Sequence, residues 1–308
     1  MEGGKQLHRY CYFEGEIIES KDAKLGIASQ TVQYGMTCFG GIRAYKQGDT
    51  IRLFRLKDHY RRLMDSTRIM GWTISLSYDE FEQILKDLIA KNKPDSSFYI
   101  RPFFYTTHEG LGPSFITPTF SLSVFSLPLG QYYDPTKGLR LTISSWQKFS
   151  DAAMPTKAKA GGCYLNSALA TTEAKRSGFD DALLLDQHGF IVEASVANIL
   201  VSYNDELYVP PASSDVLDGI TMRTVIEILD SEGITVSRQC IDRSMVYSAD
   251  ELLLTGTAAQ VQFAASVDNR PIGVGSVGKI CQLLRERFDA IIAGNDAFSA
   301  PWIMEIAL

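Results

Sequence analysis

The sequence predicts an α+β protein of two domains. Its N-terminal part mixes two hairpin patterns, two helical patterns and two longer strand patterns, which is typical of an α+β unit. Residues 129–138 (LGQYYDPTKG) have the composition of a linker, with two glycines and a proline. We therefore expect a small domain over residues 1–128, an interdomain loop over 129–138 and a larger domain over 139–308.

The elements of the N-terminal part follow from local patterns. Residues 10–13 and 16–18 are predicted to form a hairpin that turns at Glu14-Gly15, and 42–45 and 51–54 to form another. Apolar residues at helical spacing predict helices over 57–70 and 79–91. Two strand-like stretches follow at 97–105 and 119–127.

The C-terminal part continues with shorter elements. A strand is expected over residues 139–146, and a helix over 164–176 that ends before Gly178, a usual residue after a helix C-terminus. A buried strand at 182–185 then turns into 190–192. The remaining expected elements are a hairpin around Asn204-Asp205, helices over 221–231 and 279–293, and a strand over 250–255.

Composition excludes several classes of function. The hydrophobic fraction of 45% and charged fraction of 21% are ordinary for a soluble globular protein. A net charge of −6 disfavours a nucleic-acid partner, and neither a membrane span nor a secretory signal is expected. Five scattered cysteines predict reduced thiols in the cytoplasm, and four histidines without ligand spacing predict no metal site.

Residues 154–200 hold the groups that a carbonyl cofactor needs. Lys157 and Lys159 offer ε-amines, which form a Schiff base once burial or a neighbouring cation lowers the amine pKa. Pyridoxal phosphate also needs a carboxylate near its pyridine nitrogen and benefits from a hydroxyl at its phenolic oxygen. Tyr164 and Glu193 lie at the ends of the same strand–helix–hairpin unit. Because the two lysines are two residues apart in an extended run, periodicity does not choose between them.

A phosphate site is expected where LDGIT, residues 217–221, leads into a helix. A helix N-terminus with its N–H groups and positive dipole end binds phosphate well. Gly219 permits close approach of the backbone, and the hydroxyls of Thr221 and Thr257 can add hydrogen bonds.

Several spaced motifs together resemble one family. The runs KAGGCYL, EAKRSGFDDALLLD and GFIVEASVANIL look like the cofactor segment of the branched-chain amino-acid aminotransferases, which are fold-type IV pyridoxal-phosphate enzymes. On either side, the matching runs are YGMTCFGGIRAY, DHYRRLMDS, YIRPFFY, LDGITMRTVIEI and ELLLTGTAAQV. The resemblance therefore covers nearly the whole chain in one order.

The resemblance implies a role for each matching residue. The Schiff-base lysine of the family directly precedes A-G-G, which is Lys159 here. Its remaining cofactor-binding residues correspond to Arg62, Tyr164, Glu193, Ile220, Thr221 and Thr257. Its substrate-binding residues correspond to Tyr34, Phe39, Tyr99, Arg101, Tyr132 and Ala258.

The resemblance also implies a fold and an activity. We expect a small N-terminal α/β sandwich, a larger C-terminal pseudo-barrel domain with the cofactor between them, and a homodimer or hexamer of dimers. The expected reaction is ping-pong transamination of leucine, isoleucine and valine with 2-oxoglutarate through pyridoxamine phosphate, as in branched-chain amino acid biosynthesis. The partners would be small-molecule amino acids and 2-oxo acids.

The chain departs from the family pattern at several positions. Gly40 stands in place of a glutamate, Cys163 of an asparagine, and Gln260 and Phe263 of a glutamate and a proline. We expect these changes to alter the substrate range. Two alternatives remain: another fold-type IV enzyme (a D-amino-acid or R-amine transaminase, or aminodeoxychorismate lyase), and a non-catalytic binding protein on the same scaffold.

Overall fold

The chain consists of two compact units. The computed structural model describes residues 6–116 and 119–308, and its strands fall into two sheets. Unit 1 comprises Met1–Gly130, Ala158–Gly162 and Ile291–Leu308, and unit 2 comprises Gln131–Lys157 and Cys163–Ala290. Helices and strands are mixed in both units, as expected for an α+β protein.

The sheet of unit 1 is antiparallel throughout its described pairings. Its strands run in the order β17 (Ile303–Ala307), β5 (Thr50–Phe54), β4 (Ile42–Gln47), β6 (Phe98–Thr106), β7 (Phe120–Pro128), β1 (Tyr10–Phe13) and β2 (Glu16–Glu19), with β3 (Thr37–Phe39) beside β6. The two predicted hairpins and the pair β6–β7 are confirmed. Strands β3 and β17 were not predicted, because both pair with strands far away in sequence.

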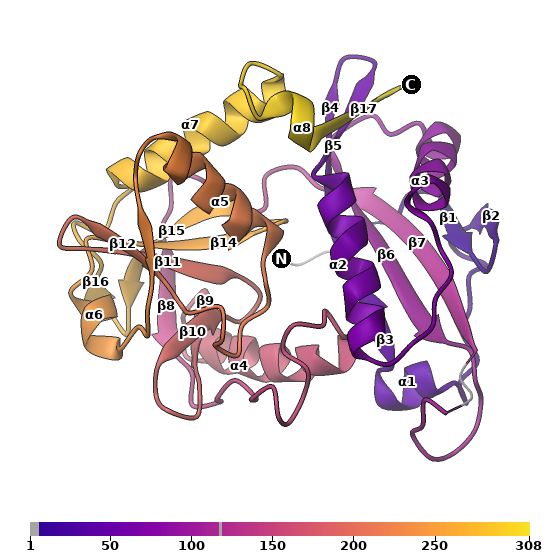
Figure 1. Cartoon of the computed structure of the whole chain (residues 1–308), viewed down its shortest axis with the longest axis horizontal. Helices are drawn as coiled ribbons and strands as arrows, with labels where there is room; N and C mark the ends of the chain where they lie inside the picture. Colours follow the sequence, from indigo (N-terminus) through magenta and orange to yellow (C-terminus); the bar gives the residue numbers. More distant parts are fainter. Residues whose placement is uncertain (1–5, 117–118) are drawn as a thin grey trace. The chain divides into compact units, whose positions relative to one another are not determined.

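Two amphipathic helices accompany this sheet. They are α2 (Leu56–Ile69) and α3 (Tyr78–Asn92), close to the predicted helices (Figure 1). Ser77 and Glu80 form a capping box at the start of α3, which buries Phe81 and Leu85. Two short helices, α1 (Gln30–Tyr34) and α8 (Ser299–Trp302), were not predicted, since one turn carries little periodicity.

The sheet of unit 2 is mixed. Strand β8 (Leu139–Ile143) is parallel to β9 (Asp181–Leu185) and β15 (Gln260–Val267), and β12 (Glu206–Val209) is parallel to β13 (Val236–Arg238). The full order is β10 (Ile191–Ala194), β9, β8, β15, β14 (Glu251–Gly256), β11 (Asn198–Tyr203), β12 and β13, with β16 (Arg270–Pro271) beside β15. Strand β15 was not predicted, because polar and small residues interrupt its apolar pattern.

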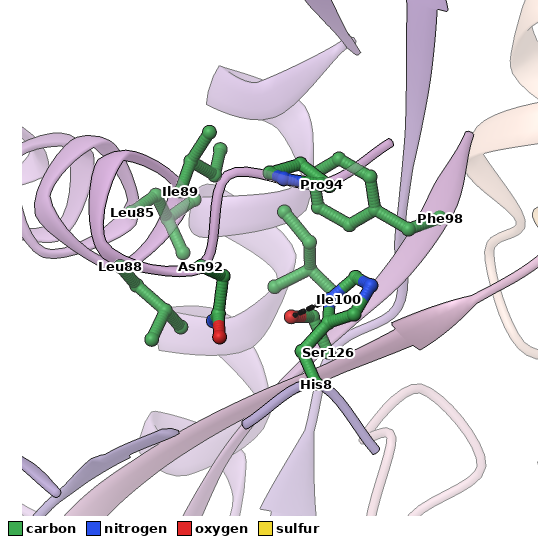
Figure 2. A pocket seen from close by; sticks show the side chains of 9 residues that line it. All are labelled: His8, Leu85, Leu88, Ile89, Asn92, Pro94, Phe98, Ile100 and Ser126. Carbon is green, nitrogen blue, oxygen red and sulfur yellow. Dashed lines mark hydrogen bonds between the residues drawn. The ribbon is translucent and has the colours of Figure 1, made fainter. Parts of the chain in front are cut away.

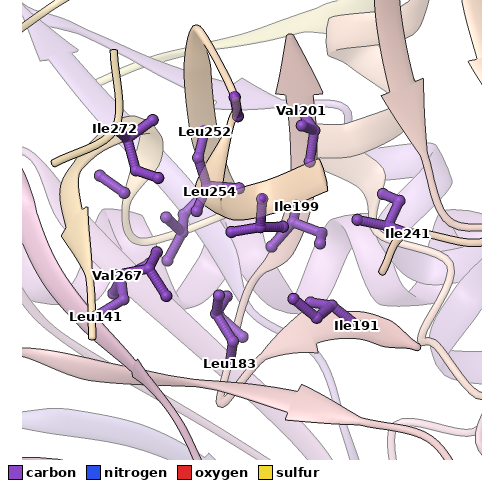
Figure 3. Close-up of a cluster of buried hydrophobic side chains, with 14 of the residues drawn as sticks. Leu141, Leu183, Ile191, Ile199, Val201, Ile241, Leu252, Leu254, Val267 and Ile272 are labelled. Atoms are coloured by element: carbon purple, nitrogen blue, oxygen red, sulfur yellow. The ribbon is translucent and has the colours of Figure 1, made fainter. Parts of the chain in front are cut away.

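One apolar core shows that this sheet curls on itself. Figure 3 shows Leu183, Ile191, Ile199, Leu254 and their neighbours converging in one cluster, although β10 and β11 lie far apart in the sheet order. Strands β10 and β11 are joined by a short turn, in which Ala194 N donates to Ala197 O at 2.8 Å. The predicted pseudo-barrel therefore corresponds to a partly closed sheet around this core.

The helices of unit 2 follow the predicted pattern. Helix α4 (Tyr164–Arg176) and helix α7 (Lys279–Ala293) have the predicted bounds, and α5 (Ile220–Ser231) begins one residue earlier than expected. The short α6 (Arg243–Tyr247), which Asp242 caps, was not predicted. Within the described residues, no helix combines the length and apolar character that a bilayer crossing requires.

A small apolar pocket in unit 1 holds a histidine. Figure 2 shows His8 beside Phe98, with its Nδ1 2.8 Å from the hydroxyl of Ser126. Leu85, Leu88 and Ile89 of α3 line the same pocket. Burial lowers the pKa of His8, and Asp95 opposes this only in part. The neutral imidazole is therefore the form that the folded state prefers.

This environment predicts a pH-dependent contribution to stability. The contribution is fully present above the ordinary histidine pKa of about 6.5, and it is lost as the pH falls towards the lowered folded-state value. We expect His8→Gln to reduce the fall in urea midpoint between pH 7.5 and pH 5.5, whereas His188→Gln, at an exposed turn, leaves it unchanged. An identical pH profile in the wild type and His8→Gln would contradict this role.

Candidate active site

The main chain of Lys159 is anchored within unit 1. Its N–H donates to Ser66 Oγ at 3.0 Å, and its carbonyl accepts from Phe39 N at 2.9 Å. The next residue, Ala160, forms a bridge with Cys38 of β3. Lys159 thus extends the edge of the sheet next to β3, and its ammonium lies 5.0 Å from the centroid of the Phe39 ring.

Ser66 links this anchor to the helix that carries Arg62. The Ser66 hydroxyl donates to Arg62 O at 2.8 Å, one turn earlier on α2, while it accepts from Lys159 N. Ser66 itself is fully buried, so this hydrogen bond is shielded from water. The predicted phosphate arginine and the predicted Schiff-base lysine therefore belong to segments that one side chain joins.

Three of the predicted substrate residues contact one another in unit 1. The Arg101 guanidinium carbon lies 4.5 Å from the centroid of the Phe39 ring and 5.2 Å from that of Tyr99. Arg101 Nη2 also donates to the Tyr99 hydroxyl at 3.0 Å. The ring of Phe39 thus lies next to two cations, Arg101 and Lys159, which makes an apolar wall flanked by positive charge.

Two other predicted positions in unit 1 have different surroundings. Tyr34 ends α1 and is 39% exposed, and its hydroxyl accepts from Gly112 N at 3.3 Å. Gly40 packs against Pro102, since a Cβ on Gly40 would lie 2.9 Å from Pro102 Cγ. The chain thus packs a glycine against Pro102 at the position where the family pattern has a glutamate.

In unit 2, Glu193 is a buried carboxylate on β10. It is 7% exposed, and its Oε1 lies 2.5 Å from Lys148 Nζ. Its Oε2 accepts from Leu217 N at 3.3 Å. A buried charge is tolerated only when it is paired and hydrogen-bonded, and Lys148 supplies the pairing. Sequence reasoning missed Lys148, because nothing in the local pattern distinguishes it from a surface lysine.

The start of α5 is an open helix N-terminus. Its N-cap residue, Gly219, provides no side-chain cap among the described residues, so the N–H groups of the first turn face no capping oxygen there. A Cβ on Gly219 would lie 1.8 Å from Asn198 Oδ1, so only glycine fits. Asn198 Nδ2 in turn donates to Leu217 O at 2.9 Å, which fixes the approach to the helix.

Thr257 and Ala258 lie in the turn between β14 and β15, which is close to the segment that connects β10 and β11. Gly256, the last residue of β14, packs against the segment between β10 and β11, with a Cβ position 3.6 Å from Val196 O. Asn198, which begins β11, pairs with Thr255. The first turn of α5 and the β14–β15 turn therefore flank one strand connection in unit 2.

These features fit the cofactor that the sequence suggests. Unit 2 offers a buried carboxylate for a pyridine nitrogen and, at the start of α5, a helix N-terminus with a threonine in its first turn for a phosphate. Tyr164 begins α4 directly after the turn Gly161–Cys163. Unit 1 offers a lysine whose main chain is held on both sides.

The second candidate lysine, Lys157, is held by the main chain of unit 2. Its ammonium donates to three carbonyls, those of Ala212 at 2.8 Å and of Ser214 and Val216 at 2.9 Å. Burial lowers the pKa of Lys157, and nearby acidic groups oppose the shift. All three of its N–H donors are thus engaged by carbonyls, a structural role that sequence periodicity could not reveal.

Gln262, next to the changed position Phe263, binds the segment Asp134–Lys137. Gln262 is 2% exposed and donates to Lys137 O at 2.7 Å and Asp134 O at 3.3 Å. Arg285 Nη1 donates to Pro135 O at 2.8 Å and also contacts Gln262. These two side chains tether the loop that carries Tyr132, whose ring lies edge-on to Tyr133.

A protein-family model matches most of the chain. The family is described as amino-transferase class IV, and the match covers residues 37–267. A similar relative is the probable branched-chain-amino-acid aminotransferase of Aquifex aeolicus, which is 36% identical over 300 residues that cover 96% of each chain.

Solved structures of related enzymes have the same fold. The branched-chain amino acid aminotransferase from Thermobaculum terrenum in its PLP form has a TM-score of 0.92 at 28% identity, covering 98% of this chain and 99% of that one. The T.th. enzyme with pyridoxamine 5'-phosphate has a TM-score of 0.91 at 34% identity, covering 96% of this chain and 97% of that one.

The T.th. enzyme is also known in two further complexes. One contains N-(5'-phosphopyridoxyl)-L-glutamate, with a TM-score of 0.89, and the other contains 4-methylvaleric acid, with a TM-score of 0.88; both are 34% identical and cover 96% of this chain and 97% of that chain.

Sequence, fold and site geometry thus agree on one family. The fold is that of the related structures, and the residues proposed to hold the cofactor are of the required types. The chain belongs to the class IV aminotransferases, within the branched-chain amino-acid aminotransferase family, and it is a pyridoxal-phosphate-dependent enzyme.

Proposed function

We propose that the enzyme transfers the amino group of L-leucine, L-isoleucine and L-valine to 2-oxoglutarate in a ping-pong cycle. The observation that carries this proposal is the apolar wall at Phe39, over which both an amine, Lys159, and a guanidinium, Arg101, are positioned. An amino acid with an apolar side chain and a carboxylate suits such a surface. The complexes of the T.th. enzyme with a branched acid and a glutamate adduct support both substrate classes.

We further propose that Lys159, Tyr164 and Glu193 serve one pyridoxal phosphate. When bound, this cofactor supplies an electron sink for the bond broken at the substrate Cα. Lys159 holds it covalently and then moves the Cα proton as general acid and base. Tyr164 binds its phenolic oxygen, and Glu193 keeps its pyridine nitrogen protonated. The phosphate is bound by Arg62, Ile220, Thr221 and Thr257.

The anchoring of Lys159 suits these two tasks. Its main chain is fixed by Ser66 and Phe39, so its Cα stays in place while the four-carbon side chain swings. The same amine can therefore bind the cofactor and later carry a proton between two atoms.

Four aromatic residues are proposed to select the side chain of the substrate, and two further residues to bind its carboxylates. Tyr34, Phe39, Tyr99 and Tyr132 surround the side chain of the donor, while Arg101 and Ala258 bind carboxylates. An apolar pocket separates substrates that differ by one methylene by only about 1–3 kcal/mol. All three branched-chain donors are therefore accepted, with modest differences between them.

The active form is a homodimer or a hexamer of dimers. Leu165 and Leu169 lie four residues apart on α4, so they share one face of the helix, and they are 69% and 37% exposed. An exposed apolar face of this kind suits burial against a second copy of the chain.

A half-reaction with purified holoenzyme tests the donor directly. We expect L-leucine, without any oxo acid, to remove the long-wavelength absorbance band of the bound cofactor, and 2-oxoglutarate to restore it. D-alanine should leave the band unchanged. A response to D-alanine but not to L-leucine would contradict the proposed specificity and indicate a D-amino-acid transaminase.

Replacement of the reactive lysine tests the proposed mechanism. Lys159→Ala should reduce multiple turnover by at least about 10³-fold, because general acid–base transfer alone contributes about 10²–10⁴-fold. Steady-state assays with L-leucine and 2-oxoglutarate measure this loss. The matched control is Lys175→Ala, at an exposed position in the last turn of α4, which should keep full activity. Sustained turnover by Lys159→Ala without an added amine would exclude the assignment.

A further inference from the structure

Lys157 binds a loop that leads into the proposed phosphate site. It is the last residue of unit 2 before the chain passes into unit 1. Its ammonium donates to the carbonyls of Ala212, Ser214 and Val216, which belong to the connection between β12 and α5. Three carbonyls from alternate residues thus converge on one cation.

This convergence depends on the positive charge. Carbonyl oxygens that point towards one spot repel one another, and a cation placed between them offsets this repulsion. The ammonium supplies three donors in the required directions. Burial lowers the pKa of Lys157, while Asp218, Asp151, Glu193 and Asp215 oppose the shift, so its immediate surroundings are on balance acidic. Without the ammonium, the three carbonyls would have to turn towards solvent, and the loop would change conformation.

A second contact fixes the segment that precedes Lys157. Asp151 N donates to Asp215 Oδ1 at 2.9 Å, which joins the segment before Lys157 to the same loop. Asp151 Oδ1 accepts from Thr156 N at 2.8 Å and from Thr156 Oγ1 at 2.9 Å. The segment from Asp151 to Lys157 is therefore a preformed turn that clasps the loop at two points.

The loop between β12 and α5 leads to two groups that are proposed to hold the cofactor, the Glu193 carboxylate and the N-terminus of α5. Directly after Val216, Leu217 N donates to Glu193 Oε2 at 3.3 Å, and Leu217 O accepts from Asn198 Nδ2 at 2.9 Å. Gly219 then caps α5. A displacement of residues 212–216 would therefore reach both the carboxylate of Glu193 and the first turn of the helix.

We propose that Lys157 is a positioning residue for pyridoxal phosphate, which acts by ordering the loop between β12 and α5. This inference rests on the proposed roles of Glu193 and the α5 N-terminus. Lys157 contacts main-chain carbonyls and needs no contact with the cofactor for this role. Its removal should weaken cofactor binding while the chemistry of the loaded enzyme is retained.

The test is a titration of each apoenzyme with pyridoxal phosphate, followed by absorbance, together with kcat at saturating cofactor. Lys157→Met retains the length of the side chain but removes every donor. We expect its Kd for the cofactor to rise about tenfold or more, with kcat changed by no more than about twofold. Lys157→Arg, which retains charge and donors, should recover part of the affinity. Lys175→Met, at an exposed site, should bind like the wild type.

A second variant covers the case in which Lys157→Met does not fold. Asp215→Ala removes the contact with Asp151 N and one of the acidic groups near Lys157, and it should weaken cofactor binding in the same direction but less. Wild-type affinity in either folded variant would overturn the proposal, and so would a loss of kcat without a change in Kd. Thr221→Ala tests the proposed phosphate site independently of Lys157. If this variant binds pyridoxal phosphate as tightly as the wild type, the assignment of the phosphate site to α5 is refuted, whatever the result for the Lys157 variants.

Discussion

The burial of the Glu193 carboxylate is the constraint around which unit 2 is arranged. A carboxylate that is 7% exposed must be matched by a cation and by hydrogen-bond donors. Lys148 provides the cation and Leu217 N provides a donor. The strand that carries Glu193, the segment after β8 that carries Lys148 and the loop before α5 are therefore tied together at one point.

The same point connects structure to chemistry. Leu217 lies two residues before Gly219, so the donor that stabilises the carboxylate also sets the approach to the open N-terminus of α5. The close packing of Gly219 on Asn198 leaves no room for a side chain. The carboxylate proposed to bind the pyridine nitrogen and the helix proposed to bind the phosphate are thus linked by a short, tightly held piece of main chain, which suits a rigid cofactor.

Unit 1 fixes the lysine that is proposed to react with the cofactor in a different way. Lys159 is fixed through its main chain, by Ser66 on one side and Phe39 on the other. A fixed main chain that carries a long side chain suits a residue proposed to bind covalently and to transfer protons. Lys157, two residues earlier, is held instead at its ammonium, by three carbonyls.

Local patterns predicted the elements that bury an amphipathic face or close a tight hairpin, such as α3, α7 and the β1–β2 pair. They did not predict β17, whose partner β5 lies some 250 residues earlier, because such pairing leaves no local signal. Residue types pointed to a lysine, Glu193 and the α5 start as cofactor-binding groups, and the family resemblance chose Lys159 over Lys157; these assignments stay predictions. Local patterns could not predict the ion pair of Lys148 with Glu193 or the hydrogen bonds from Lys157 to three carbonyls. Both depend on which main-chain and side-chain atoms the fold brings together.

The most direct test of this account is the protonation state of the cofactor's pyridine nitrogen. Holoenzyme reconstituted with pyridoxal phosphate labelled with nitrogen-15 in the ring would be measured by nuclear magnetic resonance, in the wild type and in Glu193→Gln. The account predicts a protonated ring nitrogen in the wild type and an unprotonated one in the variant. The same chemical shift in both proteins would contradict the role of Glu193 on which the account depends.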